Sequence, residues 1–326
     1  MAETKRIAVF DNIKFLLIVL VIYCHLRNIG CAIPWPLYRV IYSFHMPFFV
    51  LLSGYFTSKG KEPRKFWNSN LNLFLLFLIF SAVSALVNVF VYDKAPFTNF
   101  YTPSFALWYL LCMIYWRVAV YYIPEKVLKS PWFIALSFAL SVVPVLIDVN
   151  YFSFARCLAF FPYFLLGWIC RENHFEKTLD NASSKWKWIL LAGTFVCCMI
   201  AVFLPEDLFW ARLPFGASVP KTVFYKVLSW PIALMIPVGV YILMPKNKGI
   251  GEGRYTLFYY LFHTILLFPV FDLIVKHLPK NYVVTVIVLV LIVGIIFLLR
   301  KIPFLDKMMG IGKNGFGKKM EKPQLQ

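Results

Sequence analysis

Long apolar runs, separated by short polar segments, follow one another along almost the whole chain. A helix needs about 20 predominantly apolar residues to cross the hydrocarbon core of a bilayer. Applied to this pattern, that length predicts spans at residues 13–30, 37–56, 71–92, 105–123, 132–147, 154–170, 188–204, 222–243, 255–274 and 282–299. We therefore expect an all-α integral membrane protein with about ten transmembrane helices, forming one domain over residues 1–302.

The basic residues of the polar segments are distributed unevenly between the two predicted sides of the membrane. The side that holds both termini carries 22 Lys and Arg residues, against 7 on the other side. Because loops rich in Lys and Arg stay in the cytoplasm, we expect both termini to be cytoplasmic, which requires an even number of spans. The basic tail at 303–326 is predicted to be disordered. Its positive charge either keeps the C-terminus on the cytoplasmic side or binds anionic lipid headgroups.

Composition supports a membrane protein and excludes several other classes. Of the 326 residues, 61% are hydrophobic and only 15% are charged, whereas a soluble domain is usually about a quarter charged. The net charge of +18 follows from the loop asymmetry, so we expect no nucleic-acid partner. The seven cysteines form no Cys-x-x-Cys pair and no group with zinc-ligand spacing. We therefore expect buried, unreactive thiols and no metal. No cleavage site follows the first apolar run, which we expect to remain as a helix.

Ionisable residues inside the first span are the best candidates for chemistry. Asp11, Lys14 and His25 lie along one stripe of the helix. Lys14 and His25 are separated by roughly 16 Å along the axis, with Lys14 near the cytoplasmic end and His25 in the outer half. Charged and polar groups in a span are costly, so this stripe should face the bundle interior or a wet cavity. The alternative is a structural His25, hydrogen-bonded to a neighbouring helix.

A second histidine lies in the next predicted span, in the segment Phe44-His45-Met46-Pro47. Pro47 lacks an N–H and should kink this helix. Counted from the turn at Pro34 and Pro36, His45 comes to the same depth as His25. Two imidazoles at one level form an acid/base centre, or they are both packing residues.

Two more polar residues lie in later spans. Arg156 begins the sixth span on the outer side and needs an anion or several acceptors, since a guanidinium does not lose its charge. Asp148 is a possible partner, which would make the pair structural. His263 lies in the inner half of the ninth span and is uninformative by itself.

These segments together resemble acyltransferase family 3 of the bacterial membrane O-acyltransferases, and in particular its fucose-4-O-acetylase-like branch. The resemblance covers nearly the whole chain, in the family's order. It rests on five blocks: the Lys14, ten-residue spacer and His25 pattern; Phe44 to Phe56, with Ser53-Gly54-Tyr55; Trp108-Tyr109-Leu110; Arg156 followed by Phe161 to Gly167; and Thr256 to His263.

The resemblance implies an enzyme of the bacterial inner membrane that transfers an acyl group, most simply acetyl from acetyl-CoA, to a sugar hydroxyl. No tightly bound cofactor is implied, and the acceptor would be a lipid-linked or polymeric glycan. His25 matches the family's essential histidine, as general base or acyl carrier. The remaining assignments are His45 as a second catalytic residue; Lys14, Arg64 and Lys65 for the donor phosphates; and Arg156, Trp108, Ser53 and His263 for substrate. The family's Arg-x-x-Arg pair at the start of the third helix is missing here.

Two other functions compete with this interpretation. Buried charge within many helices also suits a transporter or flippase for a glycan or an amphiphile. Transporters commonly contain two related halves with broken helices in matching places, and this sequence has no such pairing. A relative without catalytic activity, acting as a sensor or scaffold, is the third possibility, because the Arg-x-x-Arg pair is missing.

Overall fold

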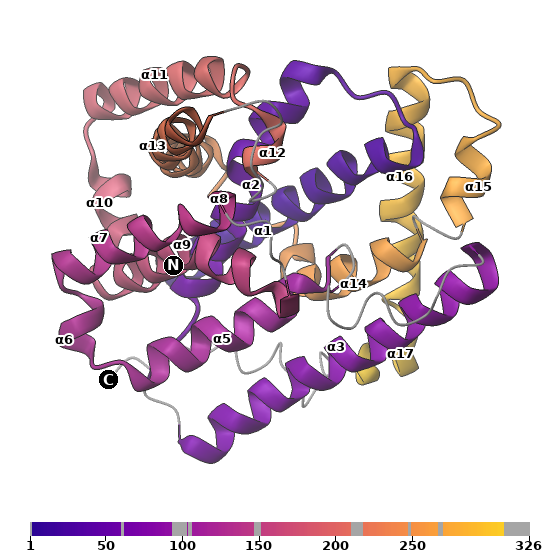
Figure 1. The fold of residues 1–326 in the computed structure, drawn as a ribbon, viewed down its shortest axis with the longest axis horizontal. Coiled ribbons are helices and arrows are strands. Elements are labelled where there is room, and N and C mark those ends of the chain that lie inside the picture. The colour runs from indigo at the N-terminus through magenta and orange to yellow at the C-terminus, as the bar shows by residue number, and fades with distance from the viewer. Residues whose placement is uncertain are drawn as a thin grey trace. The chain divides into compact units, whose positions relative to one another are not determined.

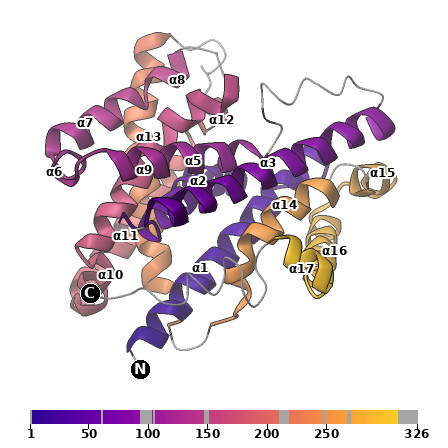
Figure 2. The ribbon, with the colours of Figure 1, turned by 90° about the horizontal axis from the view of Figure 1, so that it is seen from below.

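A computed structural model describes residues 2–59, 62–92, 103, 106–146, 151–209, 218–246, 249–266 and 270–309. Helices and turns make up this described part, and no strand occurs in it (Figures 1 and 2). The chain divides into two compact units. The first comprises residues 1–35, 82–96 and 244–326, and the second comprises residues 36–81 and 97–243.

Several helices are long enough and apolar enough to cross a membrane, so the chain is a multi-pass membrane protein. In the described part of the chain there are six, at Ala8–Ile29, Pro63–Val91, Tyr151–Glu172, Ser184–Ala201, Val219–Leu243 and Tyr282–Leu299. The all-helical fold predicted from the apolar pattern is confirmed. The count of ten spans and the cytoplasmic location of the termini remain predictions.

Of the four predicted spans that are not among these six, the one at 37–56 forms the 21-residue helix α2 (Trp35–Tyr55), and the others are shorter or broken. The fifth, at 132–147, is split into α7 (Pro131–Leu140) and α8 (Val143–Leu146). Pro144 has no N–H to continue the ladder from α7. The ninth, at 255–274, contains α14 (Thr256–Leu266) and the short α15 (Asp272–Val275). Apolar length therefore predicted these segments but not the interruptions within them.

The first unit is built around α1 (Ala2–His25), which continues into the 3₁₀ turn η1 (Leu26–Ile29). The 3₁₀ turn η3 (Glu252–Tyr255), α14 and α16 (Tyr282–Leu299) pack against α1. Fully buried side chains recur on α1 at helical spacing and form its core stripe: Ile13, Leu17, Ile18, Val21 and Ile22. The unit ends in α17 (Pro303–Met308), so the tail predicted to be disordered begins with a helical turn.

The second unit contains the remaining elements. They are α2 (Trp35–Tyr55), the first part of α3 (Pro63–Tyr92), α5 (Trp108–Tyr122), α6 (Glu125–Leu128), α7, α8, η2 (Tyr151–Ser153), α9 (Phe154–Glu172), α10 (Phe175–Asn181), α11 (Ser184–Ala201), α12 (Glu206–Phe209) and α13 (Val219–Leu243). Helix α9 packs against α5, α7 and α8, and α11 packs against α13.

Two glycines bring α2 and α9 into backbone contact. A Cβ at Gly54 would overlap the carbonyl of Phe164, and a Cβ at Gly167 would overlap the carbonyl of Leu51. Only glycine permits so close an approach of two helices. This crossing gives a physical reason for the glycines in two of the five sequence blocks.

Candidate functional site

The first unit brings two histidines from opposite ends of the sequence together. His25 is the last residue of α1, and its Nδ1 lies 3.0 Å from Nε2 of His263 on α14. The two ring planes differ by 24°. His263 is fully buried, whereas His25 is only partly buried. The pair thus has one fully enclosed member and one that is partly exposed.

Hydrogen bonding fixes the proton positions of this pair. Nδ1 of His263 lies 3.1 Å from the carbonyl oxygen of Tyr259. A carbonyl only accepts, so this nitrogen carries the proton. A fully buried imidazole is disfavoured as a cation, which leaves Nε2 of His263 as an acceptor. Nδ1–H of His25 therefore donates to His263, and the proton-free nitrogen of His25 is Nε2.

The contact corrects one prediction. The sequence placed His25 in the outer half of its span and His263 in the inner half, yet the two imidazoles lie at one level. The count assumed one helix over residues 255–274, whereas α14 ends at Leu266. His263 therefore lies in the second half of the observed helix rather than in the first half of the predicted one.

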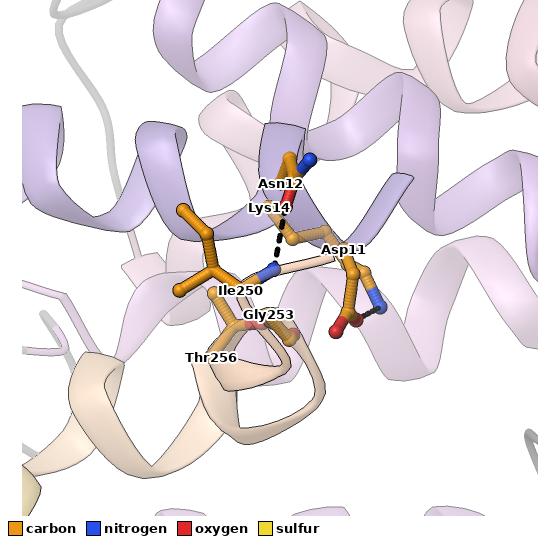
Figure 3. Close-up of polar contacts among 6 residues, drawn as sticks. All are labelled: Asp11, Asn12, Lys14, Ile250, Gly253 and Thr256. Carbon is orange, nitrogen blue, oxygen red and sulfur yellow. Dashed lines mark hydrogen bonds and ion pairs between the residues drawn. The ribbon is translucent and has the colours of Figure 1, made fainter. Parts of the chain in front are cut away.

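A polar clamp near the start of α1 positions the segment that leads into η3 (Figure 3). The amide of Asn12 donates to the carbonyl of Pro245 at 3.0 Å and accepts from the N–H of Ile250 at 2.8 Å. One turn of η3 then packs directly on α1, because a Cβ at Gly253 would overlap the backbone of Asp11. The approach of α14 to α1 is therefore set at its first residues.

Lys14, predicted to bind donor phosphates, lies beside this clamp. Its ammonium group is 3.4 Å from the carboxylate of Asp11, and its side chain is 17% exposed. Figure 3 shows the two side chains pointing towards each other. Two of the three residues of the predicted stripe thus pair with each other, and Asp11 already neutralises part of the Lys14 charge.

An ion pair secures η3 to α16. Arg300 donates to Glu252 at 2.8 Å, and the hydroxyl of Tyr259 donates to the other carboxylate oxygen at 3.0 Å. The Arg300 guanidinium also lies 3.9 Å from the ring centroid of Tyr255. Tyr259 connects this cluster to the histidines, since its carbonyl accepts from His263.

In the second unit, His45 is buried and has a defined tautomer. Its Nδ1 lies 2.8 Å from the carbonyl of Ile41, so this nitrogen is protonated and Nε2 is an acceptor. The ring of Tyr42 meets it edge-on, with centroids 4.8 Å apart. The pairing of His45 with His25 stays a prediction.

Arg156 and Trp108, both predicted to bind substrate, lie together in this unit. The Arg156 guanidinium is 5.5 Å from the ring centroid of Trp108, and Phe160 stacks on Trp108 with ring centroids 5.3 Å apart. The proposed partner Asp148 lies outside the described residues. The cation–π contact with Trp108 offsets part of the cost of placing the Arg156 charge inside the unit.

Ser53 is held by α2 itself. Its hydroxyl donates to the carbonyl of Phe49 at 2.8 Å and also meets the hydroxyl of Tyr109. No histidine lies among these partners, so the adjacent base that a serine nucleophile needs is missing from them. These contacts favour a packing role for Ser53.

The basic residues at the start of α3 are solvent-facing. Arg64 and Lys65 are exposed, and Lys65 pairs with Glu62 at 2.9 Å. They remain candidates for the donor phosphates. Four of the seven cysteines predicted to be buried are so, namely Cys24, Cys31, Cys112 and Cys157, whereas Cys170, Cys197 and Cys198 are half-buried. Burial raises the pKa of the Cys31 thiol, which makes it a poor nucleophile.

The sequence reasoning missed two buried basic residues of the second unit. Arg117 and Lys226 are each 6% exposed, on α5 and α13. Apart from Lys14, Arg27, Arg39 and Arg156, they are the only Lys or Arg residues inside the ten predicted spans. That property could have identified them, because a charged residue within a span is rare and is a functional candidate by default.

Comparison with known proteins identifies the family. The family model described as an acyltransferase domain, of acyltransferase family 3, matches residues 7–301. The match includes every candidate residue described above. Neither the comparison with curated proteins nor the comparison with solved structures finds a match.

Proposed function

The chain belongs to acyltransferase family 3, and from this membership we propose that it is a membrane O-acyltransferase whose base is His25. The donor is acetyl-CoA or another acyl-CoA, and the acceptor is a hydroxyl of a lipid-linked or polymeric glycan at the bacterial inner membrane. Family membership favours acyl transfer over the transporter alternative. The observation that supports the base assignment is the 3.0 Å contact between His25 and His263.

The histidine pair matches the requirements of general-base catalysis. His263 is oriented by the Tyr259 carbonyl and accepts the Nδ1 proton of His25. This arrangement leaves the lone pair of His25 on Nε2, where it can take a proton from a sugar hydroxyl. A fixed partner for the second nitrogen also stabilises the imidazolium that forms during transfer.

The reaction then balances in two steps. As Nε2 of His25 takes the hydroxyl proton, the sugar oxygen attacks the thioester carbonyl and a tetrahedral oxyanion forms. Collapse of this intermediate breaks the C–S bond, and the departing thiolate receives the proton from His25. Positioned proton transfer of this kind contributes about 10²–10⁴ in rate. Transfer through an acyl-His25 intermediate is the alternative route.

Other residues serve binding in this proposal. Lys14, Arg64 and Lys65 attract the donor phosphates as point charges. Arg156 and Trp108 bind the glycan acceptor. His45 has an acceptor nitrogen, and with Arg156 it is a candidate for holding the acceptor or the developing oxyanion.

The test is His25→Ala in the purified, membrane-reconstituted protein, with His277→Ala as the matched control. His277 is exposed and follows α15. We expect His25→Ala to lower the transfer of labelled acetyl from acetyl-CoA to a glycan acceptor by at least about 100-fold. His277→Ala should transfer at the wild-type rate. Wild-type activity in His25→Ala would refute the base assignment.

A second measurement identifies the substrates. Mass spectrometry of surface glycans from cells with and without the gene gives the acyl group from the mass increment and the acceptor from the modified sugar. No difference in acylation between the two strains would contradict a glycan acceptor.

A further inference from the structure

A buried arginine in the second unit has too few partners for its charge. Arg117 of α5 is 6% exposed, and its Nη2 donates to the hydroxyl of Ser69 on α3 at 2.7 Å. Within the described part of the chain, Ser69 is its only hydrogen-bonding partner, and no carboxylate pairs with it. A guanidinium has five N–H donors and remains charged.

A neutral hydroxyl does not compensate for burying this charge. Ion pairs inside proteins persist when both charge and hydrogen bonds are matched, and an uncompensated buried charge is strongly destabilising. The remaining donors of Arg117 form a fork that suits a bidentate anion. The chain itself provides no such anion among its described residues.

A second unpartnered group lies next to Ser69. Asn70 is 2% exposed, and both its amide nitrogen and its amide oxygen are buried without a hydrogen-bond partner. Buried amides in native proteins almost always have partners, so an orphaned one needs an explanation. Its NH₂ group offers two more donors on α3, one residue after Ser69.

Asn70 on α3 and Arg117 on α5 lie at similar heights along the two helices. Phe66, one turn before Asn70 on α3, stacks on Tyr121 of α5 with ring centroids 4.0 Å apart. Tyr121 is one turn after Arg117, so α3 and α5 are in contact along this stretch. Asn70 lies seven residues after Pro63, where α3 begins, which is about 10 Å along the axis. The group is therefore close to the end of α3 that is predicted to face the cytoplasm.

We infer that Arg117, Ser69 and Asn70 form a binding site for a phosphate group. Several convergent donors around one positive charge match a tetrahedral anion with several acceptor oxygens. The phosphate belongs either to coenzyme A, which rests on the proposed function, or to an anionic phospholipid headgroup, which does not. Near the membrane surface, both are within reach.

The test uses the full-length protein in lipid nanodiscs and two ligands. Calorimetry measures the affinity for coenzyme A, and native mass spectrometry measures retention of phosphatidylglycerol against phosphatidylcholine. We expect Arg117→Gln to weaken one of these by about 10- to 100-fold, since a charge-assisted phosphate contact is lost. Arg171→Gln is the matched control, because that guanidinium donates to the Thr57 carbonyl at 2.9 Å, and it should bind both ligands as wild type does.

Asn70→Leu covers the case in which Arg117→Gln fails to fold. No hydrogen bond of the protein is lost in Asn70→Leu, so its thermal midpoint without ligand should equal or exceed that of the wild type, while ligand binding weakens. Weaker binding of coenzyme A assigns the site to the acyl donor. Weaker retention of phosphatidylglycerol assigns it to a lipid headgroup. Wild-type binding of both ligands by Asn70→Leu, or by a folded Arg117→Gln, would overturn the inference.

His25→Ala separates this inference from the proposed function. The variant should lose acyl transfer yet bind coenzyme A with wild-type affinity. If His25→Ala transfers normally while Arg117→Gln loses ligand, the phosphate site stands and the base assignment fails.

Discussion

Nδ1 of His25 donates to Nε2 of His263 across 3.0 Å, and this hydrogen bond determines which nitrogen of His25 is able to act as a base. The Tyr259 carbonyl sets the tautomer of His263, and His263 in turn sets that of His25. In the proposed mechanism, a buried histidine thus acts on the reaction through another side chain. This role makes His263 a positioning residue.

His263→Ala should lower kcat by about 10- to 100-fold, because one hydrogen bond that orients the base is lost. His263→Gln should recover part of this loss, since its side-chain oxygen accepts at nearly the position of Nε2. The KM for acetyl-CoA should be unchanged in both. The measurement is steady-state acetyl transfer at fixed acceptor concentration. Equal kcat values for the Ala and Gln variants would argue for a packing role.

Arg156→Ala should raise the KM for the glycan acceptor by about tenfold, the effect of one lost hydrogen bond to a polar ligand. The KM for acetyl-CoA should stay within twofold, because the donor is assigned to other residues. Trp108→Leu should act in the same direction, since it removes the ring that Arg156 covers at 5.5 Å. If Arg156→Ala changed only the KM for acetyl-CoA, the assignment of Arg156 to the acceptor would be wrong.

Gly54→Ala should destabilise the protein by about 1–3 kcal/mol or more, because the added Cβ overlaps the Phe164 carbonyl and pushes α2 from α9. Gly294→Ala on α16 is the control. A Cβ there meets no atom within 4 Å. Because alanine reduces the conformational freedom of the unfolded chain, the stability of this variant should equal that of the wild type or exceed it by about 0.5–1 kcal/mol. Thermal unfolding in detergent compares the two, and equal midpoints would show that the close crossing is absent.

Asn12→Ala should lower stability by about 1–3 kcal/mol, because the carbonyl of Pro245 and the N–H of Ile250 lose their side-chain partner. It should also reduce kcat, since the clamp sets where α14 approaches α1. Gly253→Ala should reduce kcat by the same route, through overlap with Asp11. Transfer rate is measured together with the thermal midpoint. Full activity in both variants would show that the contacts of Asn12 and Gly253 do not position the histidine pair.

The fold class and the family were predictable because they depend on local features. Apolar run length predicts membrane helices, and the spacing of Lys14 and His25 falls within one helix. Breaks were harder to predict, because the sequence stays largely apolar where α7 ends and α8 begins. Run length therefore gave the number of residues in a segment but not its depth in the membrane.

The partner of His25 could not be predicted from spacing, because it depends on how α14 packs against α1. The sequence favoured His45, which is close along the chain, whereas the observed partner lies in another sequence block. Arg117 was missed for a different reason. One charge in a long apolar window barely lowers its mean hydropathy, and its significance depends on which partners the fold provides.

The separation of the histidines along the chain also affects biogenesis. His25 and His263 are 238 positions apart, so at a synthesis rate of about 5–20 residues per second the second imidazole follows the first by about 10–50 s. A nascent or truncated chain that stops before α14 contains the base but not the group that orients it. In the proposed mechanism, efficient transfer therefore requires that nearly the entire polypeptide has entered the bilayer.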